Sequence, residues 1–199
     1  MRWVALSAVV AALVSISSFG FATVFQVQPG VFDPDGTGIV TAQWIGRQGL
    51  PDDVGKANQA LLLQKDGPTS ANASAFAVIG GVEGLTITEL GFDYRNDGHC
   101  GAGAPRFNVT LPGGQYFFLG CVYGNPQIAP PSGWTRIRWN AIEGTVFPAG
   151  DYSWPGFPQV VQSIAIVFDE GTDVGPGFAL LDNIDINGSL IGKPVVRTP

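Results

Sequence analysis

Residues 91–109, "GFDYRNDGHCGAGAPRFNV", place the only histidine of the chain, His99, beside one of its two cysteines, Cys100. Acidic and basic residues flank the pair. A zinc site would need three or four Cys, His or carboxylate ligands, and one His-Cys pair does not supply them. Nucleophilic chemistry would pair the two side chains, but adjacent residues in extended backbone point apart. We therefore expect this loop to be fastened to the fold rather than reactive.

The first 22 residues have the layout of a secretory signal peptide. Arg2 is the only charged residue before Asp33, and small or apolar residues follow it. Gly20 and Ala22 are small residues at the two positions that precede a signal-peptidase cut, so cleavage is expected after Ala22. The alternative is an uncleaved anchor, because the uncharged run is just long enough to span a bilayer. We expect a secreted or cell-surface protein that meets a membrane only if this segment is retained.

Export would place Cys100 and Cys121 in an oxidising compartment. Two cysteines allow one intrachain pairing, so a disulfide between them is predicted. It would close a loop of about twenty residues and stabilise the fold by ~3 kcal/mol in the loop-entropy model. The alternative is a pair of free, buried thiols.

The segment "DPDGTG" (residues 33–38) alternates oxygen-bearing side chains in the manner of the first half of a calcium loop. It is not an EF-hand, because position 44 is Trp instead of the required Glu. Acidic residues at positions 169, 170 and 173 could complete a structural site. The expected Ca²⁺ ligands are Asp33, Asp35, Thr37 and Asp182. The alternative, which turn statistics favour, is a plain Asp/Gly turn.

Sugar binding needs flat aromatic side chains with hydrogen-bonding neighbours on an accessible surface. The segment "DYSWPGFP" (residues 151–158) is the best candidate, because its two prolines interrupt strand pairing and leave the aromatics on a loop. Trp44 and Trp139 lie among apolar residues and are expected in the core. The predicted ligand-binding residues are Tyr152, Trp154, Phe157, Tyr94, Arg95, Asn96, Asp97 and Arg106.

Glycoside hydrolysis would require two carboxyl groups on opposite sides of the bond that breaks. The acids considered able to meet on one sheet are Glu89, Asp93, Asp169 and Glu170. The chain carries no Gly-x-Ser-x-Gly motif and no other recognisable catalytic motif. We therefore expect a binding protein rather than an enzyme, and we predict no catalytic residue.

Strands must position these side chains, because no dozen residues keep a helical apolar spacing without an interrupting Gly or Pro. At most, a single helical turn is expected near residues 52–58. The 28 Gly and 15 Pro follow no repeat, which indicates turns between short strands. The predicted strands are Val24–Gln28, Gly38–Trp44, Gln59–Lys65, Ala75–Gly81, Leu85–Tyr94, Arg106–Leu111, Gln115–Val122, Trp134–Trp139, Val160–Asp169 and Phe178–Asn187.

Two strands indicate how the sheets are buried. In "FALLDNIDI" (residues 178–186), strict alternation puts Asp182 on the same face as Ile184 and Ile186, where an unpaired carboxylate would be costly. The run at residues 163–168 is apolar on both sides, which predicts a central strand. The chain has 199 residues, of which 45% are hydrophobic and 13% charged, enough for one domain with a sizeable core.

The order of "NQALLLQKDG", "AFAVIGGVEGLTITELGFDYR" and "GFALLDNIDINGSL" resembles the galactose-binding-like jelly-roll sandwiches. Many carbohydrate-binding modules and exported bacterial domains of unknown function share that fold. The resemblance spans residues 24–190 and implies an all-β sandwich in which a calcium ion commonly bridges early and late strands. It transfers function only by analogy.

These observations predict residues 1–22 as signal peptide, 23–190 as a jelly-roll-type β-sandwich of about ten short antiparallel strands, and 191–199 as a tail. We expect a monomeric, secreted module that binds carbohydrate or another extracellular polymer, with Ca²⁺ as a structural cofactor. The alternatives are a structural envelope or matrix protein and a polysaccharide-cleaving enzyme. Nucleic acid is not an expected partner, because the net charge is −6 and the ten Lys and Arg residues are scattered.

Overall fold

The computed structural model describes residues 24–51, 58–127, 132–141, 147–148 and 154–192. The expected signal peptide lies outside these ranges, as do residues 52–57 of the helical turn considered near 52–58 and residues 193–199 of the expected tail 191–199. Within the described ranges, the structure has no helix of the length and apolar character that a membrane span requires.

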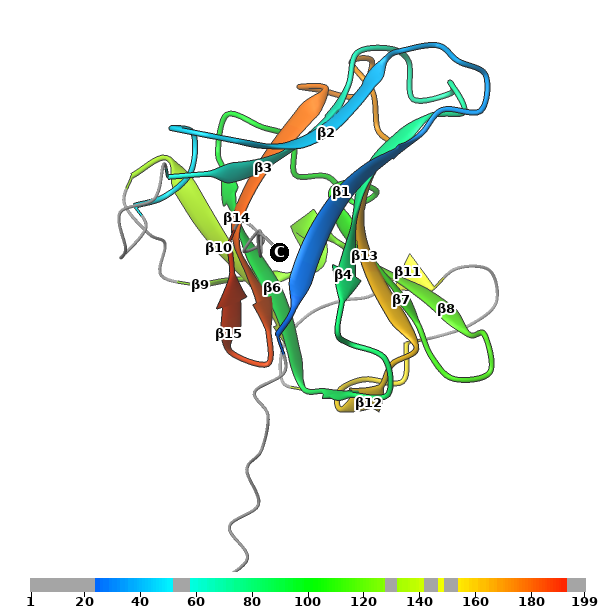
Figure 1. Cartoon of the computed structure of the whole chain (residues 1–199), viewed down its shortest axis with the longest axis vertical. Coiled ribbons are helices and arrows are strands. Elements are labelled where there is room, and N and C mark those ends of the chain that lie inside the picture. Colours follow the sequence, from blue (N-terminus) through cyan, green and yellow to red (C-terminus); the bar gives the residue numbers. More distant parts are fainter. Residues whose placement is uncertain (1–23, 52–57, 128–131, 142–146, 149–153, 193–199) are drawn as a thin grey trace, which may run out of the picture.

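Two antiparallel sheets packed face to face make up the molecule, which confirms the expected all-β, jelly-roll-type sandwich (Figure 1). In spatial order, the six-stranded sheet consists of β1 (Gln26–Phe32), β4 (Ser74–Gly80), β13 (Ser163–Phe168), β7 (Arg106–Thr110), β8 (Tyr116–Gly120) and β11 (Phe147–Pro148). The seven-stranded sheet consists of β2 (Val40–Ile45), β3 (Ala60–Lys65), β14 (Phe178–Ile186), β6 (Glu89–Arg95), β10 (Trp134–Asn140) and β9 (Asn125–Gln127), with β15 (Ser189–Ile191) beside β14.

Three short elements lie outside the two large sheets. β5 (Thr86–Ile87) pairs with β12 (Gln159–Val160) in a separate two-stranded sheet. A single 3-10 turn, η1 (Cys121–Tyr123), follows β8. The predicted strand Leu85–Tyr94 is therefore two strands, β5 in the small sheet and β6 in the seven-stranded sheet. The chain passes from one sheet to the other at Thr88. There the Thr88 amide donates a hydrogen bond to the Asn187 side chain at 2.7 Å.

The core lies between the sheets and is built from alternate residues of each strand. Three large aromatic rings cross it: Phe92 from the seven-stranded sheet, Phe107 from the six-stranded sheet, and Trp139 from β10. Their centroids are 5.4 to 5.5 Å apart. Trp139 is fully buried and Trp44 is partly buried against the core, where its ring N–H donates to the Val27 carbonyl at 3.3 Å. Both tryptophans thus lie where the sequence predicted.

β1 extends four residues beyond the predicted end at Gln28, through Pro29 and Gly30. Proline lacks an amide hydrogen, which would leave a gap in the hydrogen bonding of a central strand. β1 is an edge strand that pairs only with β4, so the proline is tolerated there. A side chain at Gly30 would collide with the Phe76 ring, since its Cβ would lie 2.6 Å from that ring. The Phe76 ring therefore lies across the strand at the glycine.

The predicted central strand is confirmed, because β13 pairs with β4 on one side and with β7 on the other. The face assignment for residues 178–186 is wrong. The register of β14 against β6 shifts between Asp182 and Asp185, and Asn183 adopts a positive φ of 44°. This bulge reverses the alternation, so Ile184 and Ile186 enter the core while Asp182 faces outward.

Candidate functional site

A cleft of about 820 Å³ lies over one end of the six-stranded sheet, on the face turned away from the core. The cleft is lined by residues at or next to the ends of four strands, β1, β4, β13 and β7. The strand β8 contributes Phe118. The loop from Thr69 to Ala73 forms one rim and the loop around Gly103 another. Alternation explains which side chains reach it: Arg106 and Asn108 are half-buried on the outer face, while Phe107 is fully buried in the core.

Arg106 is the most constrained side chain of the cleft floor. Its guanidinium donates to both carboxylate oxygens of Asp169, at 2.6 and 2.7 Å, and to the Gly103 carbonyl at 2.6 Å. Its Nε donates to the Asn108 side chain at 2.9 Å. The guanidinium also lies over the Phe118 ring, 4.5 Å from its centroid, which is a cation–π distance. Neighbouring strands therefore hold one arginine in a single orientation.

The floor continues from Phe118 to Tyr116, which stands next to it on the same face of β8. The two rings are 5.1 Å apart and edge to face. The Asn108 amide donates to the Tyr116 hydroxyl at 2.6 Å, and burial raises the pKa of that hydroxyl. The phenol therefore stays protonated, and its hydrogen can be donated to a further acceptor.

Phe32, which is 50% exposed, stands at the other side of the cleft at the end of β1. The side chains of Asn72 and Ser74 line the wall beside it. The lining of the cleft thus includes both aromatic rings and residues with amide or hydroxyl groups. Sequence reasoning missed Phe32, Asn72 and Phe118 as site residues, because only the pairing of β1 with β4 and of β7 with β8 brings them together.

His99 is tied to the fold, as expected. Its Nε2 pairs with the Glu170 carboxylate, its amide donates to the Phe178 carbonyl at 2.8 Å, and its ring meets Phe168 edge-on at 6.0 Å. Both paired side chains are mostly buried, with 11% and 19% exposure. Glu170 also lines the cleft, so the His99 loop forms part of its support.

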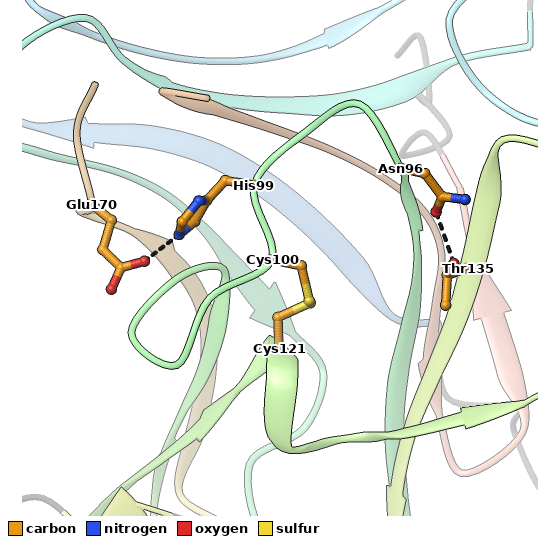
Figure 2. Close-up of a disulfide and its surroundings, with 6 residues drawn as sticks. All are labelled: Asn96, His99, Cys100, Cys121, Thr135 and Glu170. Carbon is orange, nitrogen blue, oxygen red and sulfur yellow. Dashed lines mark hydrogen bonds and ion pairs between the residues drawn. A yellow bond between two sulfur atoms is a disulfide. The ribbon is translucent and has the colours of Figure 1, made fainter. Parts of the chain in front are cut away.

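The predicted disulfide between Cys100 and Cys121 is confirmed, with Cα atoms 5.2 Å apart. Figure 2 shows that His99 points toward Glu170 while the adjacent Cys100 points toward η1. The bridge joins the loop that follows β6 to the end of β8. It therefore anchors the Gly103 rim of the cleft from behind.

The remaining polar candidates lie on the other sheet. Tyr94 is partly buried against the core, Arg95 pairs with Asp97 at 2.6 Å, and Asn96 accepts a hydrogen bond from Thr135 at 2.7 Å. Tyr94 and Arg95 end β6 in the seven-stranded sheet and Asn96 and Asp97 follow it, whereas Arg106 begins β7 in the six-stranded sheet. Of the predicted ligand-binding residues in the described part of the chain, Arg106 is the one that lines the cleft.

The predicted aromatic loop is more buried than expected. Tyr152 lies outside the described residues. Trp154 contacts Phe117 and Phe157, with ring centroids 5.3 and 5.1 Å away, and packs against the core. Phe117 and Phe118 are neighbours on β8 and point to opposite faces, so the Trp154 contact is on the core side of that strand. Binding by this loop stays a prediction.

The expected calcium ligands hold other partners. The Asp33 carboxylate accepts hydrogen bonds from the Gly38 amide at 2.7 Å and from the Thr37 amide and hydroxyl at 2.9 Å; these bonds lower its pKa. Asp182 is buried, and its carboxylate accepts from the Leu50 amide at 2.7 Å. Asp33 thus holds the turn at residues 33–38 with its side chain, and Asp35 lies in that same turn. Ca²⁺ binding stays a prediction.

No cluster of three or more His, Cys, Asp or Glu side chains suited to a metal occurs in the described part of the chain. The acids at 169, 170 and 173 each have a separate partner: Arg106, His99 and Thr69. The hypothesis that four acids share one sheet is wrong. Glu89 and Asp93 belong to β6 in one sheet, and the other two follow β13 in the opposite sheet.

A buried charge network covers part of the outer face of the seven-stranded sheet. Asp93, fully buried, accepts hydrogen bonds from Arg136 at 2.8 and 2.9 Å and from Asn183 at 2.8 Å. Arg138 pairs with Asp185 at 2.9 Å. The signal in the sequence was the alternation "RIR" at 136–138, which places two arginines on one strand face. Without the register of β10 against β6, their partners could not be named.

No protein-family model matches the chain, and no curated protein matches its sequence. Among solved structures, it is similar to the family 11 carbohydrate-binding module of the cellulosomal cellulase Lic26A-Cel5E of Clostridium thermocellum, with 15% identity and a TM-score of 0.45 over 88% of this chain and 94% of that chain. A family 11 module from the same organism, in complex with a β-1,3-1,4-mixed-linked tetrasaccharide, gives 16% identity and 0.46 over 88% and 95%.

The enzymatically active domain of tailspike protein 4 of bacteriophage CBA120 is also similar, with 12% identity and a TM-score of 0.39 over 84% of this chain and 19% of that chain.

Proposed function

We propose that this protein is a secreted, non-catalytic module that binds a neutral polysaccharide in the cleft of the six-stranded sheet. The observation that carries the proposal is the lining of the cleft. The exposed ring of Phe32 and the half-buried ring of Phe118 line the cleft together with the polar residues Asn72, Ser74 and Arg106. Sugar rings present apolar C–H faces and a rim of hydroxyl groups, so they need both kinds of contact side by side.

The charges of the cleft favour a neutral glycan over an anionic one. Its arginine, Arg106, is already paired with Asp169 at two points, and Lys65 donates to backbone carbonyls. An acidic polymer would have to displace these partners, and the chain as a whole carries a net charge of −6. A neutral chain leaves the Arg106–Asp169 ion pair and the hydrogen bonds of Lys65 intact, and it uses the donors and acceptors around them.

The volume of the cleft, about 820 Å³, lies in the range of small-molecule sites and suits a few sugar units of a longer chain. Its floor continues into Tyr116, whose hydroxyl keeps a donatable hydrogen. A polymer seated in the cleft could therefore extend across β8. Glu170 and Asp169 serve in this proposal as structural partners of His99 and Arg106.

The proposal is tested by isothermal titration of the mature protein with neutral polysaccharides (β-glucans, xylans and mannans) and anionic ones (polygalacturonate and alginate). We expect binding to at least one neutral chain and a loss of ten-fold or more in affinity for Phe32→Ala. The matched control is Leu190→Ala, which removes an equally exposed apolar side chain, 52% against 50%, from β15 on the other sheet. Trp154→Ala tests the predicted aromatic loop in the same assay.

Other outcomes separate the alternatives. Equal affinity of the Phe32 and control variants would refute the cleft as the site, even if a glycan binds elsewhere. Binding to none of the polysaccharides would favour a structural matrix protein. Release of reducing ends from a polysaccharide would show an enzyme and would overturn the non-catalytic assignment.

A further inference from the structure

Lys65 is the last residue of β3 and is fully buried, with 0% exposure. The preceding inward residues of the strand, Leu61 and Leu63, point into the apolar core, and alternation sends the lysine to the same side. A buried ammonium is costly unless it is fully hydrogen-bonded. Its partners therefore determine what it does.

The Lys65 ammonium donates three hydrogen bonds, all to backbone carbonyl oxygens. The acceptors are Thr69 at 3.0 Å, Ala71 at 2.7 Å and Asp169 at 2.8 Å. An –NH₃⁺ group has three donors and a neutral amine has two, so the set of acceptors matches the charged form. Burial lowers the pKa of Lys65, while the carboxylates of Asp169 and Asp173 act in the opposite direction.

The three carbonyls belong to segments far apart in sequence. Thr69 and Ala71 lie on the rim loop of the cleft, and Asp169 follows β13, some hundred residues later. The same Asp169 holds Arg106 with its side chain. Gly171 and Gly67 approach so closely that a Cβ on Gly171 would lie 1.8 Å from the Gly67 carbonyl. One cation thus sits where the rim loop, the end of β3 and the end of β13 converge.

We propose that the carbonyl oxygens of Thr69, Ala71 and Asp169 form an oxygen cage that joins the rim of the cleft to the end of β13. Lys65 supplies this cage with a covalently attached cation. Once the lysine side chain is shortened, the cage binds a free primary ammonium ion in its place. The proposal concerns the cation that organises the cleft and does not depend on the identity of the glycan. The cage is formed by carbonyl dipoles directed at one point, so it needs a positive group with N–H donors rather than a particular side chain.

Chemical rescue tests this directly. Lys65→Ala removes Cγ, Cδ, Cε and Nζ, and n-propylammonium has the same four non-hydrogen atoms. We expect the variant to melt well below the wild type and to regain roughly half of the lost Tm at about 100 mM propylammonium chloride. Neither n-propanol, which lacks the charge, nor tetramethylammonium, which lacks N–H donors, should restore it.

Two controls accompany the variant. Gln64→Ala changes the neighbouring residue on the opposite face of β3, and its Tm, like that of the wild type, should not respond to propylammonium. Lys65→Met keeps the apolar length without the charge; it should lose stability and show no rescue, because its side chain fills the space that the amine would use. Rescue of Lys65→Met, or equal stabilisation of all four proteins, would refute a specific cage.

A second measurement covers the case in which Lys65→Ala does not fold. In the ¹⁵N-labelled wild type, the Lys65 side chain should give an –NH₃⁺ signal that persists at neutral pH, because three hydrogen bonds slow its exchange with water. A neutral-amine ¹⁵N shift, or exchange as fast as that of free lysine, would overturn the proposal. Failure of glycan binding would leave both results unchanged, so the two proposals are tested separately.

Discussion

Arg106 and Asp169, 63 residues apart in the chain, form a two-point ion pair with distances of 2.6 and 2.7 Å on the floor of the cleft. β7 begins beside the end of β13, and the antiparallel register that pairs Val167 with Arg106 brings the two side chains together. The pair fixes the plane of the guanidinium over Phe118. Four of the five N–H groups of Arg106 hold these protein partners, so the arginine can present its remaining N–H to a ligand without ordering itself first, which lowers the entropic cost of binding.

Arg106→Lys should weaken glycan binding more than it weakens the fold. Lysine keeps the charge but cannot make the two-point contact or stack on Phe118. The Asp169 side chain is 37% exposed, so solvent screening limits the stability loss to about 1 kcal/mol. Urea unfolding and titration with the glycan measure the two effects. Arg95→Lys is the control, since Arg95 pairs with Asp97 outside the cleft; a similar loss of affinity there would contradict the assignment.

Removing the disulfide should lower the free energy of unfolding by roughly 3 kcal/mol, the entropy of closing a loop of this length. The separation between Cys100 and Cys121 is 21 residues. The double variant Cys100→Ser/Cys121→Ser should lower the urea midpoint and steepen the slope of the transition, because the unfolded chain without the bridge is less compact and exposes more surface. Mass spectrometry of the unreduced wild type checks the bridge itself, and two free thiols would contradict it.

The sequence predicted what depends on local pattern and missed what depends on register. Alternation found the central strand at 163–168, and the cysteine count gave the bridge between Cys100 and Cys121. The face of Asp182 relative to Ile184 and Ile186 was predicted wrongly, because the bulge at Asn183 carries no signature beyond the residue type that tolerates positive φ.

The cleft could not be predicted, because its residues come from strands that are neighbours only after folding. Phe32 lies on the first strand of the six-stranded order and Phe118 on the fifth, and their joint presence depends on every pairing between them. Lys65 looked like an ordinary strand-ending lysine, because its three acceptors are backbone carbonyls that no residue type reveals.

Asp93→Ala should be among the most destabilising single changes on the seven-stranded sheet. The carboxylate is fully buried and accepts hydrogen bonds from Arg136 and Asn183. Its removal leaves Arg136 without its two hydrogen bonds. It also removes one of the negative charges that stabilise the buried guanidinium of Arg138. Breaking a buried pair from one side costs about 3 to 5 kcal/mol. Asp97→Ala, which removes a carboxylate with 61% exposure, should cost less than about 1 kcal/mol in the same urea series. Similar losses for both variants would argue against a structural network.

The calcium prediction is tested by thermal unfolding of the wild type in millimolar Ca²⁺ and in chelator. If Asp33 and Asp35 bind the ion, Tm should rise with Ca²⁺, and Asp35→Asn should abolish the rise. The Asp33 carboxylate already accepts three hydrogen bonds in its turn, so any ligand role must use its remaining lone pairs. An unchanged Tm across the titration would remove Ca²⁺ from the description of this protein.

Asp173 should link the stability of the rim to pH. Its carboxylate accepts the Thr69 hydroxyl at 2.6 Å and the Thr69 amide at 2.8 Å, and these bonds, the hydroxyl first, lower its pKa below the ordinary value. A carboxylate whose pKa is lower in the folded state stabilises the fold fully above its unfolded pKa, about 3.9, and loses this contribution as the pH falls through the folded value. The two hydrogen bonds between Thr69 and Asp173, which join the rim loop to the loop that follows β13, should therefore persist until the pH falls below the ordinary range of aspartate pKa values.

A carboxyl ¹³C titration by NMR measures this pKa. The titration midpoint of Asp173 should lie below the ordinary range in the wild type. In Thr69→Val it should be higher but still short of the ordinary value, because the bond from the Thr69 amide remains. Asp33, whose pKa is lowered by bonds within its own turn, provides the internal control: its midpoint should not move in Thr69→Val. A shift of both carboxyl groups together would point to a global change in the variant instead of a local tether.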